Sequence, residues 1–251
     1  MSNRPRISVI IPTFNEATRI ARAVESAKKA DATEVIVADG GSNDGTRQLA
    51  EQAGALVVPS EKGRAVQQNA GINVAASSDV YLFLHADNWL GPNCLDEIRS
   101  VWTDNEPLAG AFRQRINADG ISFRCLEFGN GLRARFLRQP YGDQGIFISA
   151  DLFREMGGFP EVPLMEELYL MRRVRKAVRP LLLSGPVHVD ARRWQKNGVV
   201  RQTLRNWSLV LRYFCGVAPE RLAEAYAEHR EVSQRVETGQ FHDETCDAAS
   251  T

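Results

Sequence analysis

Carboxylate side chains follow three apolar runs in the first ninety residues of the chain. The runs are rich in β-branched residues: residues 7–11 lead to Glu16, residues 34–38 to Asp39 and Asp44, and residues 80–84 to Asp87. Buried parallel strands have this composition, and their carboxyl ends meet at one edge of an open α/β sheet, where ligands bind. We therefore expect three acidic loops to converge on one crevice. Carboxylates there suit a ribose, a divalent metal ion and the phosphates that the metal would neutralise.

The elements that would position these loops alternate along the chain. Apolar residues switch between strand-like runs and helical spacing, which is typical of βαβ units. Helices are predicted after Asn15, over residues 46–53, 64–75, 122–136, 150–156, 166–176 and 200–213, and from Pro92 and Pro219. Further strands are predicted at residues 109–116, 181–183 and 187–189. The pattern favours a single Rossmann-like α/β domain with a mixed, mostly parallel sheet and C-terminal helices.

Length and composition agree with this prediction. A chain of 251 residues is long enough to bury one large α/β core. Lys plus Arg equals Asp plus Glu at 31 each, so the overall charge favours neither a nucleic acid nor an acidic surface as partner. The four cysteines form no C-x-x-C pair and are expected to be reduced. No apolar run is long enough for a signal peptide or a membrane span, so we expect a cytoplasmic protein.

Seven short blocks carry a family resemblance. They are residues 12–16 (PTFNE), 37–46 (VADGGSNDGT), 63–71 (GRA…NAG), 84–87 (LHAD), 142–147 (GDQGIF), 157–160 (GGFP) and 165–167 (MEE). Their order and spacing resemble family 2 glycosyltransferases of the GT-A fold from about residue 6 to residue 215. The DGGS and GDQG blocks with a later Arg-Arg-Trp also resemble small stand-alone bacterial transferases, some of them assigned to arsenosugar biosynthesis. The resemblance implies inverting transfer of a sugar from a nucleotide-diphosphate-sugar to an acceptor hydroxyl.

The resemblance also divides the chain. It implies a GT-A domain over residues 1–199, with a nucleotide-binding half at 1–90 and an acceptor half at 91–199. Amphipathic helices at 200–237 would pack on that domain, and we expect the polar tail at 238–251 to be disordered.

Donor-binding residues follow from the matched blocks. The resemblance implies nucleotide-sugar contacts for Pro12, Thr13, Asn15, Glu16, Asp39, Gly41, Arg64, Ala86, Gln144, Arg192, Arg193 and Trp194. Carboxylates such as Glu16 and Asp39 accept hydrogen bonds from ribose hydroxyls or a pyrimidine N–H. Arg64 follows Gly63 at a helix start, where guanidinium, backbone N–H groups and helix dipole would share a phosphate.

Each of these positions also has a simpler interpretation. Asn15 and Glu16 could only begin a helix, and Arg64 could be a solvated surface arginine. Residues 192–194 could be a basic flexible loop. Asp44 suits a turn or a helix cap better than a ligand contact.

The metal position should be Asp87, where family members usually carry Asp-x-Asp. This chain reads His85-Ala86-Asp87, so histidine replaces the first acidic residue. One carboxylate, phosphate oxygens and water are enough for Mg²⁺, whereas Mn²⁺ tolerates an imidazole better. The expected cofactor is Mg²⁺ or Mn²⁺, with Asp87 as ligand and His85 either as a second ligand or as a hydrogen-bonded structural residue.

The catalytic base should lie at the start of the helix beginning at residue 166. Inverting transfer needs one base to take the proton of the acceptor hydroxyl. Relatives read Glu-Asp where this chain reads Glu166-Glu167, so Glu167 is the expected base, one methylene longer than usual. Both glutamates could instead be first-turn acids that stabilise the helix dipole. Asp143 is the reserve candidate, although its Gly-Asp-x-Gly setting is also ordinary turn chemistry.

The acceptor is expected to be a small molecule or a lipid-linked hydroxyl. The segment from Val200 to Tyr213 places Leu204, Trp207 and Leu211 on one helical face and arginines elsewhere. Such a helix either packs on the core or rests on an anionic membrane as a peripheral contact.

Three other functions compete with glycosyl transfer. A catalytically lapsed nucleotide-sugar-binding protein of the same fold is kept open by the altered positions His85 and Glu167. A nucleotidyltransferase would want a glycine-rich, basic loop where this chain has the acidic residues 12–16. An NAD-dependent oxidoreductase is disfavoured because no G-x-G-x-x-G follows the first strand.

Overall fold

The computed structural model of the chain describes residues 4–75 and 77–226. The chain divides into two compact units, Met1–Arg192 and Arg193–Thr251. The domain bounds given above, 1–199 and 200–237, stay predictions, and residues 227–237 lie outside the described residues. The tail predicted at residues 238–251 lies outside the described residues.

One mixed sheet forms the centre of the first unit, in the order β3-β2-β1-β4-β7-β6-β8-β5. Its strands are β1 (Ile7–Thr13), β2 (Glu34–Asp39), β3 (Leu56–Pro59), β4 (Val80–Phe83), β5 (Asn88–Leu90), β6 (Ala109–Ile116), β7 (Ile146–Ser149) and β8 (Leu181–Val189). Strands β1 to β4 pair in parallel, and β8 is parallel to β6. Strand β7 is antiparallel to both β4 and β6, and β5 is antiparallel to β8. The parallel strands therefore bring the carboxyl ends of β1, β2 and β4 to one edge, as the sequence predicted.

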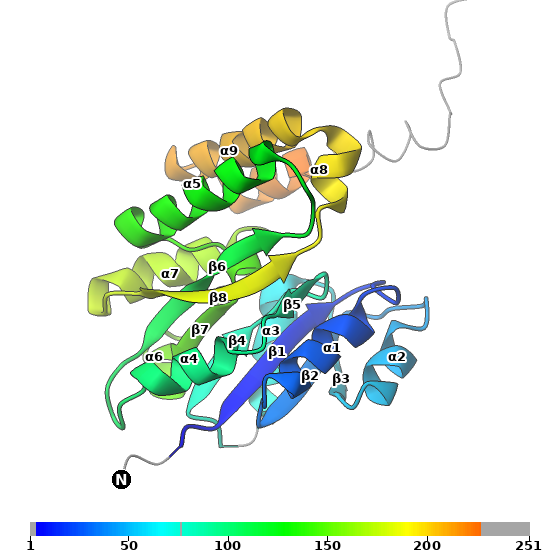
Figure 1. The fold of residues 1–251 in the computed structure, drawn as a ribbon, viewed down its shortest axis with the longest axis vertical. Coiled ribbons are helices and arrows are strands. Elements are labelled where there is room, and N and C mark those ends of the chain that lie inside the picture. Colours follow the sequence, from blue (N-terminus) through cyan, green and yellow to red (C-terminus); the bar gives the residue numbers. More distant parts are fainter. Residues whose placement is uncertain (1–3, 76, 227–251) are drawn as a thin grey trace, which may run out of the picture. The chain divides into compact units, whose positions relative to one another are not determined.

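Helices cover both faces of this sheet (Figure 1). Helices α1 (Ile20–Lys29), α2 (Thr46–Gln52) and α4 (Cys94–Val101) contribute to one buried apolar cluster. Helices α3 (Arg64–Val74), α6 (Ala150–Glu155) and α7 (Glu166–Ala177) contribute to the second. In β1, the fully buried side chains of Ile10 and Ile11 point to opposite clusters. Burial of each contributes about 1.5–3 kcal/mol to the free energy of folding. Burial of both faces explains the continuous apolar runs in the sequence.

The predicted helices are all present, but the helix at residues 192–197 and the short strands β3, β5 and β7 were not predicted. Helix α5 (Ile121–Leu137) and the 3₁₀ turn η1 (Gly142–Gln144) precede β7. The strands predicted at 181–183 and 187–189 are a single strand, β8, whose pairing with β6 shifts register between Phe112 and Gln114. Strand β5 is only three residues long, so it has too few residues for a detectable period.

The second unit is helical where it is described. Helix α8 (Arg192–Asn197) begins at the last residue of the first unit, α9 covers Val199–Phe214, and a further helix covers residues 219–226. Among the residues that the structure describes, no helix is both long and apolar enough to cross a bilayer. Cys94, Cys125 and Cys215 are free thiols.

Candidate active site

Two loops at the carboxyl ends of β1 and β2 are tied together by a buried glutamine. Gln67 of α3 donates from its Nε2 to the carbonyl oxygens of Thr13, at 2.6 Å, and of Ala38, at 2.8 Å. A Cβ on Gly40 would lie 3.1 Å from the same Nε2, so a side chain at residue 40 would crowd this clamp. Asn15 adds a second link, because its Oδ1 accepts the backbone N–H of Asn43 at 3.0 Å. The first two acidic loops are therefore held side by side.

The carboxylates of the β2 loop mainly shape the loop itself. Asp39 is buried, and its Oδ2 accepts the backbone N–H groups of Gly41 and Ser42 at 3.2 and 3.0 Å. Asp44 accepts hydrogen bonds from Thr46 and from the backbone N–H of Ala17, which lower its pKa, the Thr46 side chain most. Asp44 thus has the turn-shaping role that its sequence setting favoured. The donor role of Asp39 stays a prediction, with part of its hydrogen-bonding capacity already used.

Arg192 joins the carboxylates of the other two loops. Its Nη2 lies 3.0 Å from Oε1 of Glu16 and 3.1 Å from Oδ2 of Asp87. Burial opposes the charge on Arg192, but its hydrogen bond to Glu16 and the nearby carboxylates raise its pKa overall. The predicted convergence of Glu16 and Asp87 is therefore present, with a guanidinium between them. Arg193 and Trp194 belong to the second unit, and their donor contacts remain predictions.

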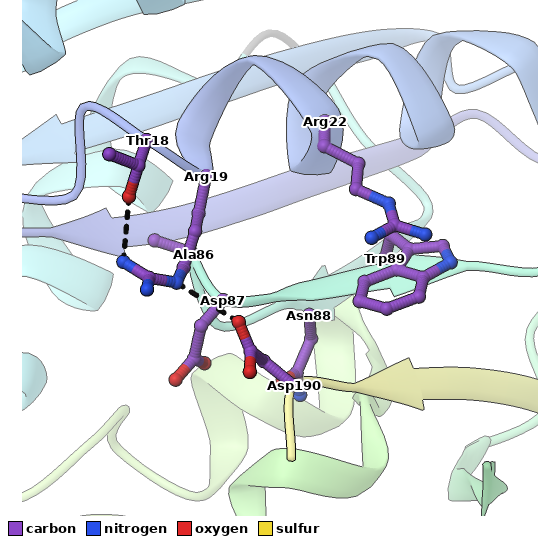
Figure 2. Close-up of a pocket in the computed structure, with 8 residues that line it drawn as sticks. All are labelled: Thr18, Arg19, Arg22, Ala86, Asp87, Asn88, Trp89 and Asp190. Atoms are coloured by element: carbon purple, nitrogen blue, oxygen red, sulfur yellow. Dashed lines mark hydrogen bonds and ion pairs between the residues drawn. The ribbon is translucent and has the colours of Figure 1, made fainter. Parts of the chain in front are cut away.

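Two residues that the sequence did not single out hold Arg192 in place. Asp190 accepts the backbone N–H of Arg192 on Oδ1 at 2.8 Å and the Nε–H of Arg19 on Oδ2 at 3.0 Å. Figure 2 shows Arg19, the residue just before α1, reaching to Asp190 beside Asp87. Arg19 also lies 3.3 Å from Oε2 of Glu16. The three carboxylates of Glu16, Asp87 and Asp190 thus share two guanidinium groups.

A cavity of about 210 Å³ borders this network (Figure 2). Its lining residues are Thr18, Arg19, Arg22, Ala86, Asp87, Asn88, Trp89 and Asp190. In one wall, the Trp89 ring has the guanidinium carbon of Arg22 at 3.2 Å from its centroid and stacks with the imidazole of His188. Sites for whole ligands usually measure about 300–1,000 Å³, so this cavity suits part of a ligand.

The second half of the site gathers four charged or titratable side chains around the start of α7. Oε1 of Glu167 lies 3.3 Å from Nε2 of His85 and 3.8 Å from Nη1 of Arg64. Oε1 of Glu166 lies 3.0 Å from Nε of the same arginine. Met165, just before the helix, has a φ of +66°, a left-handed conformation that is costly for this residue type. Both glutamates are buried in the first turn of α7, where they also lie close to the helix dipole.

The surroundings of Glu166 and Glu167 shift the pKa values of the two carboxyl groups in opposite directions. Burial is the largest influence on Glu166 and raises its pKa to about 7, against the opposing effect of Arg64. Burial alone would also raise the pKa of Glu167, but Arg64 and the hydrogen bond with His85 outweigh it and hold that pKa at about 2. The pair therefore holds one firmly ionised carboxylate, Glu167, next to one that is easily protonated.

His85 and Glu167, the two positions that the sequence resemblance implies to be altered, touch each other. An aspartate at residue 85 would place a like charge against Glu167, whereas the imidazole offers a hydrogen-bonding partner. Because Nε2 of His85 is engaged by Glu167, the contact favours the hydrogen-bonded role of His85 over that of metal ligand.

The Gly142–Gln144 turn lies against the same cluster. A Cβ on Gly142 would collide with the carboxylate of Glu167 and with Nε2 of His85, which explains the glycine. Asp143 has a buried Oδ1 with no hydrogen-bond partner among the described residues, and Asn88 donates to its backbone oxygen at 3.1 Å. Gln144 is fully buried and bonds Arg133, the Tyr141 N–H and the Phe112 carbonyl. Asp143 therefore has capacity left for a ligand, while the amide of Gln144 serves the fold.

The residues at this site could hold a divalent metal only together with phosphate oxygens of a bound donor. Within the described part of the chain, no group of three or more His, Cys, Asp or Glu side chains could hold a metal by itself. Asp87 supplies one carboxylate, and the guanidinium of Arg192 lies 3.1 Å from it, so a positive charge is already paired with this side chain. One protein carboxylate with phosphate oxygens and water is a usual ligand set for Mg²⁺.

Solved structures share this fold. The Staphylococcus aureus protein TarS, residues 1–349, in complex with UDP is 20% identical with a TM-score of 0.61, and the match covers 74% of this chain and 60% of TarS. Glucosyl-3-phosphoglycerate synthase from Mycobacterium tuberculosis, in complex with Mn²⁺, UDP and phosphoglyceric acid, is 19% identical with a TM-score of 0.53 and coverages of 74% and 69%. The first unit thus has the GT-A fold of glycosyltransferases.

The family follows from the sequence comparisons. A family model described as "Glycosyl transferase family 2" matches residues 8–154, which is more than half of the chain, so the chain belongs to glycosyl transferase family 2. Among its relatives, glycosyltransferase AglJ of Haloferax volcanii is 46% identical over 65 residues, covering 25% of this chain and 22% of AglJ. Glycosyltransferase AglE of the same organism is 32% identical, covering 63% of this chain and 57% of AglE. The matches thus span from about a fifth to just over half of these relatives.

Proposed function

We propose that this protein transfers a sugar from a nucleotide-diphosphate-sugar to an acceptor hydroxyl with inversion at the anomeric carbon. One observation carries the proposal: Asp87 of the donor network and His85 of the glutamate cluster are two residues apart, at the end of β4. The Glu16–Arg192–Asp87 network and the Arg64–Glu167–His85 cluster are therefore neighbours on one strand end. A donor bound to the first would have its reactive carbon near the second.

The donor half of the proposal rests on charge. Glu16 would accept hydrogen bonds from the nucleoside, and Arg192 and Arg64 would turn from their carboxylates to the donor's phosphates. TarS has been solved with UDP and with UDP-GlcNAc, and the mycobacterial synthase with Mn²⁺ and UDP, which supports a nucleotide donor here. Asp87 would hold Mg²⁺ or Mn²⁺, and when bound this metal supplies positive charge that stabilises the departing diphosphate.

The chemical step would use Glu167 as base. The ionised carboxylate of Glu167 takes the proton of the acceptor hydroxyl. The hydroxyl oxygen then bonds to the anomeric carbon, and the bond from that carbon to the diphosphate oxygen breaks. The products are the glycoside, the nucleoside diphosphate and a protonated Glu167. Movement of Arg64 toward the donor phosphates would remove one source of the low pKa of Glu167 and make it a stronger base. The unpartnered Oδ1 of Asp143 would orient the acceptor hydroxyl.

Two of the competing functions, a lapsed binding protein and a nucleotidyltransferase, account less well for the charged groups of this site. A lapsed binding protein has no reason to keep a buried, ionised Glu167 in contact with both His85 and Arg64, because unneeded buried charges are costly. A nucleotidyltransferase would need basic groups at the β1 loop, where Glu16 lies. The acceptor stays a small molecule or a lipid-linked hydroxyl, and the resemblance to arsenosugar transferases bears on that choice only as a prediction.

A thermal-shift screen tests the proposal with the full chain. UDP-, GDP- and TDP-sugars would be added separately, each with and without Mn²⁺, and the melting temperature recorded. A ligand at a hundred times its dissociation constant stabilises by about 2.7 kcal/mol, which corresponds to roughly 5–10 °C in a chain of this size. We expect one nucleotide class to give such a shift and Mn²⁺ to enlarge it. No shift with any of the three classes would contradict nucleotide-sugar binding.

Asp190 should act as a positioning residue for Arg192. Asp190→Ala removes the acceptor that holds both Arg192 and Arg19, so we expect donor KM to rise about tenfold with a smaller change in kcat. Asp190→Asn keeps an oxygen for the Arg192 N–H and should recover part of the loss. Asp151→Ala is the matched control, since Asp151 is an exposed acid paired with Arg154 on α6. Equal effects of the Asp190 and Asp151 substitutions would reject the positioning role.

A further inference from the structure

Helix α9 exposes a continuous row of large apolar side chains. Val200, Leu204, Trp207, Leu211 and Phe214 are each between 53% and 71% exposed. They are spaced four, three, four and three residues apart, so they form one stripe along the helix. We call these five residues the α9 stripe. Scattered exposed apolar residues are ordinary, but a stripe along a whole helix indicates an interaction surface.

The α9 stripe is not the face by which this helix is buried. The buried residues of α9 are Gln202, Leu209 and Tyr213, which lie about 180–220° around the helix from Val200. The apolar row that the sequence offered for packing on the core is thus on the opposite side. The α9 stripe is therefore left for a contact other than the one that buries Gln202, Leu209 and Tyr213.

Charge identifies that outside surface. Residues 193–214 contain Arg193, Lys196, Arg201, Arg205 and Arg212 and no Asp or Glu, although the whole chain is balanced at 31 of each sign. Arg201, Arg205 and Arg212 fall about 100–140° from Val200, which places them in one row beside the stripe. Burial lowers the pKa of Arg205 most; Tyr226 opposes this effect, and the positive charges of Arg193 and Arg201 add to it.

We propose that α9 lies in the surface of an anionic lipid bilayer, with the α9 stripe inserted among the acyl chains. Its arginines would extend along the helix side to the headgroup phosphates. A second copy of the chain fits less well, because it would bring the same row of three α9 arginines to both sides of the contact. Spanning is excluded by length, since 16 residues cover about 24 Å of a core about 30 Å thick. This inference is independent of the proposed function.

Helix α5 of the first unit offers a matched comparison. Phe128 and Phe136 are about 70% exposed, similar to the α9 residues. However, α5 contains Glu127, and its Arg124 and Arg133 are held by contacts within the first unit. Helix α5 thus has exposed apolar groups on a helix that carries an acid, whereas residues 199–214 contain none.

Co-sedimentation of the full chain with vesicles tests the proposal. We expect binding to vesicles of phosphatidylglycerol and phosphatidylcholine, weak binding to phosphatidylcholine alone, and release as salt is raised. Trp207→Ser with Leu211→Ser should weaken binding at least about tenfold. Arg201→Gln with Arg212→Gln should weaken it by about fivefold per arginine. Phe128→Ser with Phe136→Ser is the control and should bind as the native chain does.

Several results would overturn the proposal. They are no binding to anionic vesicles at low salt, unchanged binding by the Trp207 and Leu211 variant, or loss of binding confined to the α5 control. Sedimentation velocity without lipid provides a further check, because a dimer that dissociates on substitution of Trp207 and Leu211 would assign the stripe to a second copy. The substituted residues are exposed, so melting temperatures should change little and a folding defect is separable from a binding defect.

Discussion

Glu167→Gln is expected to reduce kcat about a hundred- to ten-thousandfold while leaving donor affinity close to that of the native protein. Glutamine has nearly the shape of glutamate but cannot take a proton, and losses of this size are typical for a removed general base. The fold should survive, because Arg64 keeps Glu166 as a partner at 3.0 Å. Initial rates with saturating donor and acceptor, together with nucleotide titration, measure the two quantities separately.

Glu166→Gln is the matched control one residue away. Glu166 is buried and contacts the same arginine, so a purely structural role would give similar results at both positions. We expect its activity to stay within about tenfold. The pKa of Glu166 is raised in the folded protein to about 7, so its ionisation costs stability above that pH and the cost disappears as the carboxyl becomes protonated below it. Glu166→Gln should therefore raise the melting temperature more at pH 8 than at pH 5.

Substitution of Asp143 gives the result that would contradict Glu167 as the base. A near-normal rate for Glu167→Gln together with a collapse for Asp143→Asn would move the base to Asp143, whose Oδ1 is buried without a partner among the described residues. A loss at both positions would be consistent with Glu167 as base and Asp143 as the group that orients the acceptor.

The contact between His85 and Glu167 extends this test. If the longer glutamate and the histidine compensate each other, Glu167→Asp alone should lower activity because the shorter carboxylate no longer reaches His85 at 3.3 Å. His85→Asp alone should also lower it, by placing a like charge beside Glu167. The double variant restores the usual family residues and should be more active than the product of the two single effects predicts. Strict additivity would show that the two positions are not coupled.

The sequence predicted which loops meet, because that depends on the order of the strands. It did not predict which side chains pair with one another, either within a loop or between distant residues. Glu16 and Asp87 could be expected to meet because each follows a buried strand, and the parallel pairing of β1 with β4 brings the strand ends together. Asp39 follows the same rule but closes its own turn, since the next N–H groups compete for its carboxylate. The pairing of Arg19 with Asp190 joins residues 171 positions apart, and no periodicity reports such a contact.

Burial was the other quantity that the sequence could not supply. Glutamates at a helix start are usually exposed, so nothing local indicated that Glu166 and Glu167 would be buried against Arg64. In α9 the same apolar spacing is compatible with a helix that packs and with one that exposes its stripe. Only the position of Leu209 and Tyr213 on the buried side distinguishes these alternatives.

Asp87→Asn is expected to abolish the part of turnover that depends on added Mg²⁺ or Mn²⁺, a loss of about a hundredfold or more. Asparagine keeps the shape and a carbonyl oxygen but loses the negative charge that a divalent cation requires. Arg192 retains Glu16 at 3.0 Å, so the surrounding network should stay folded. The nucleotide-induced thermal shift should persist without metal and should no longer increase when Mn²⁺ is added. Asp151→Asn, on an exposed pair, should change neither quantity.

The variant also separates two roles that Asp87 could have, as metal ligand and as partner of Arg192. If Asp87 mainly holds Arg192, Asp87→Asn should weaken nucleotide binding equally with and without metal, and Arg192→Met should reproduce that pattern. If Asp87 is the metal ligand, Arg192→Met should instead weaken binding under both conditions while Mn²⁺ still enlarges the thermal shift. Normal turnover of Asp87→Asn with metal still required would exclude Asp87 as the ligand, and the cation would then need a different carboxylate at this edge of the sheet.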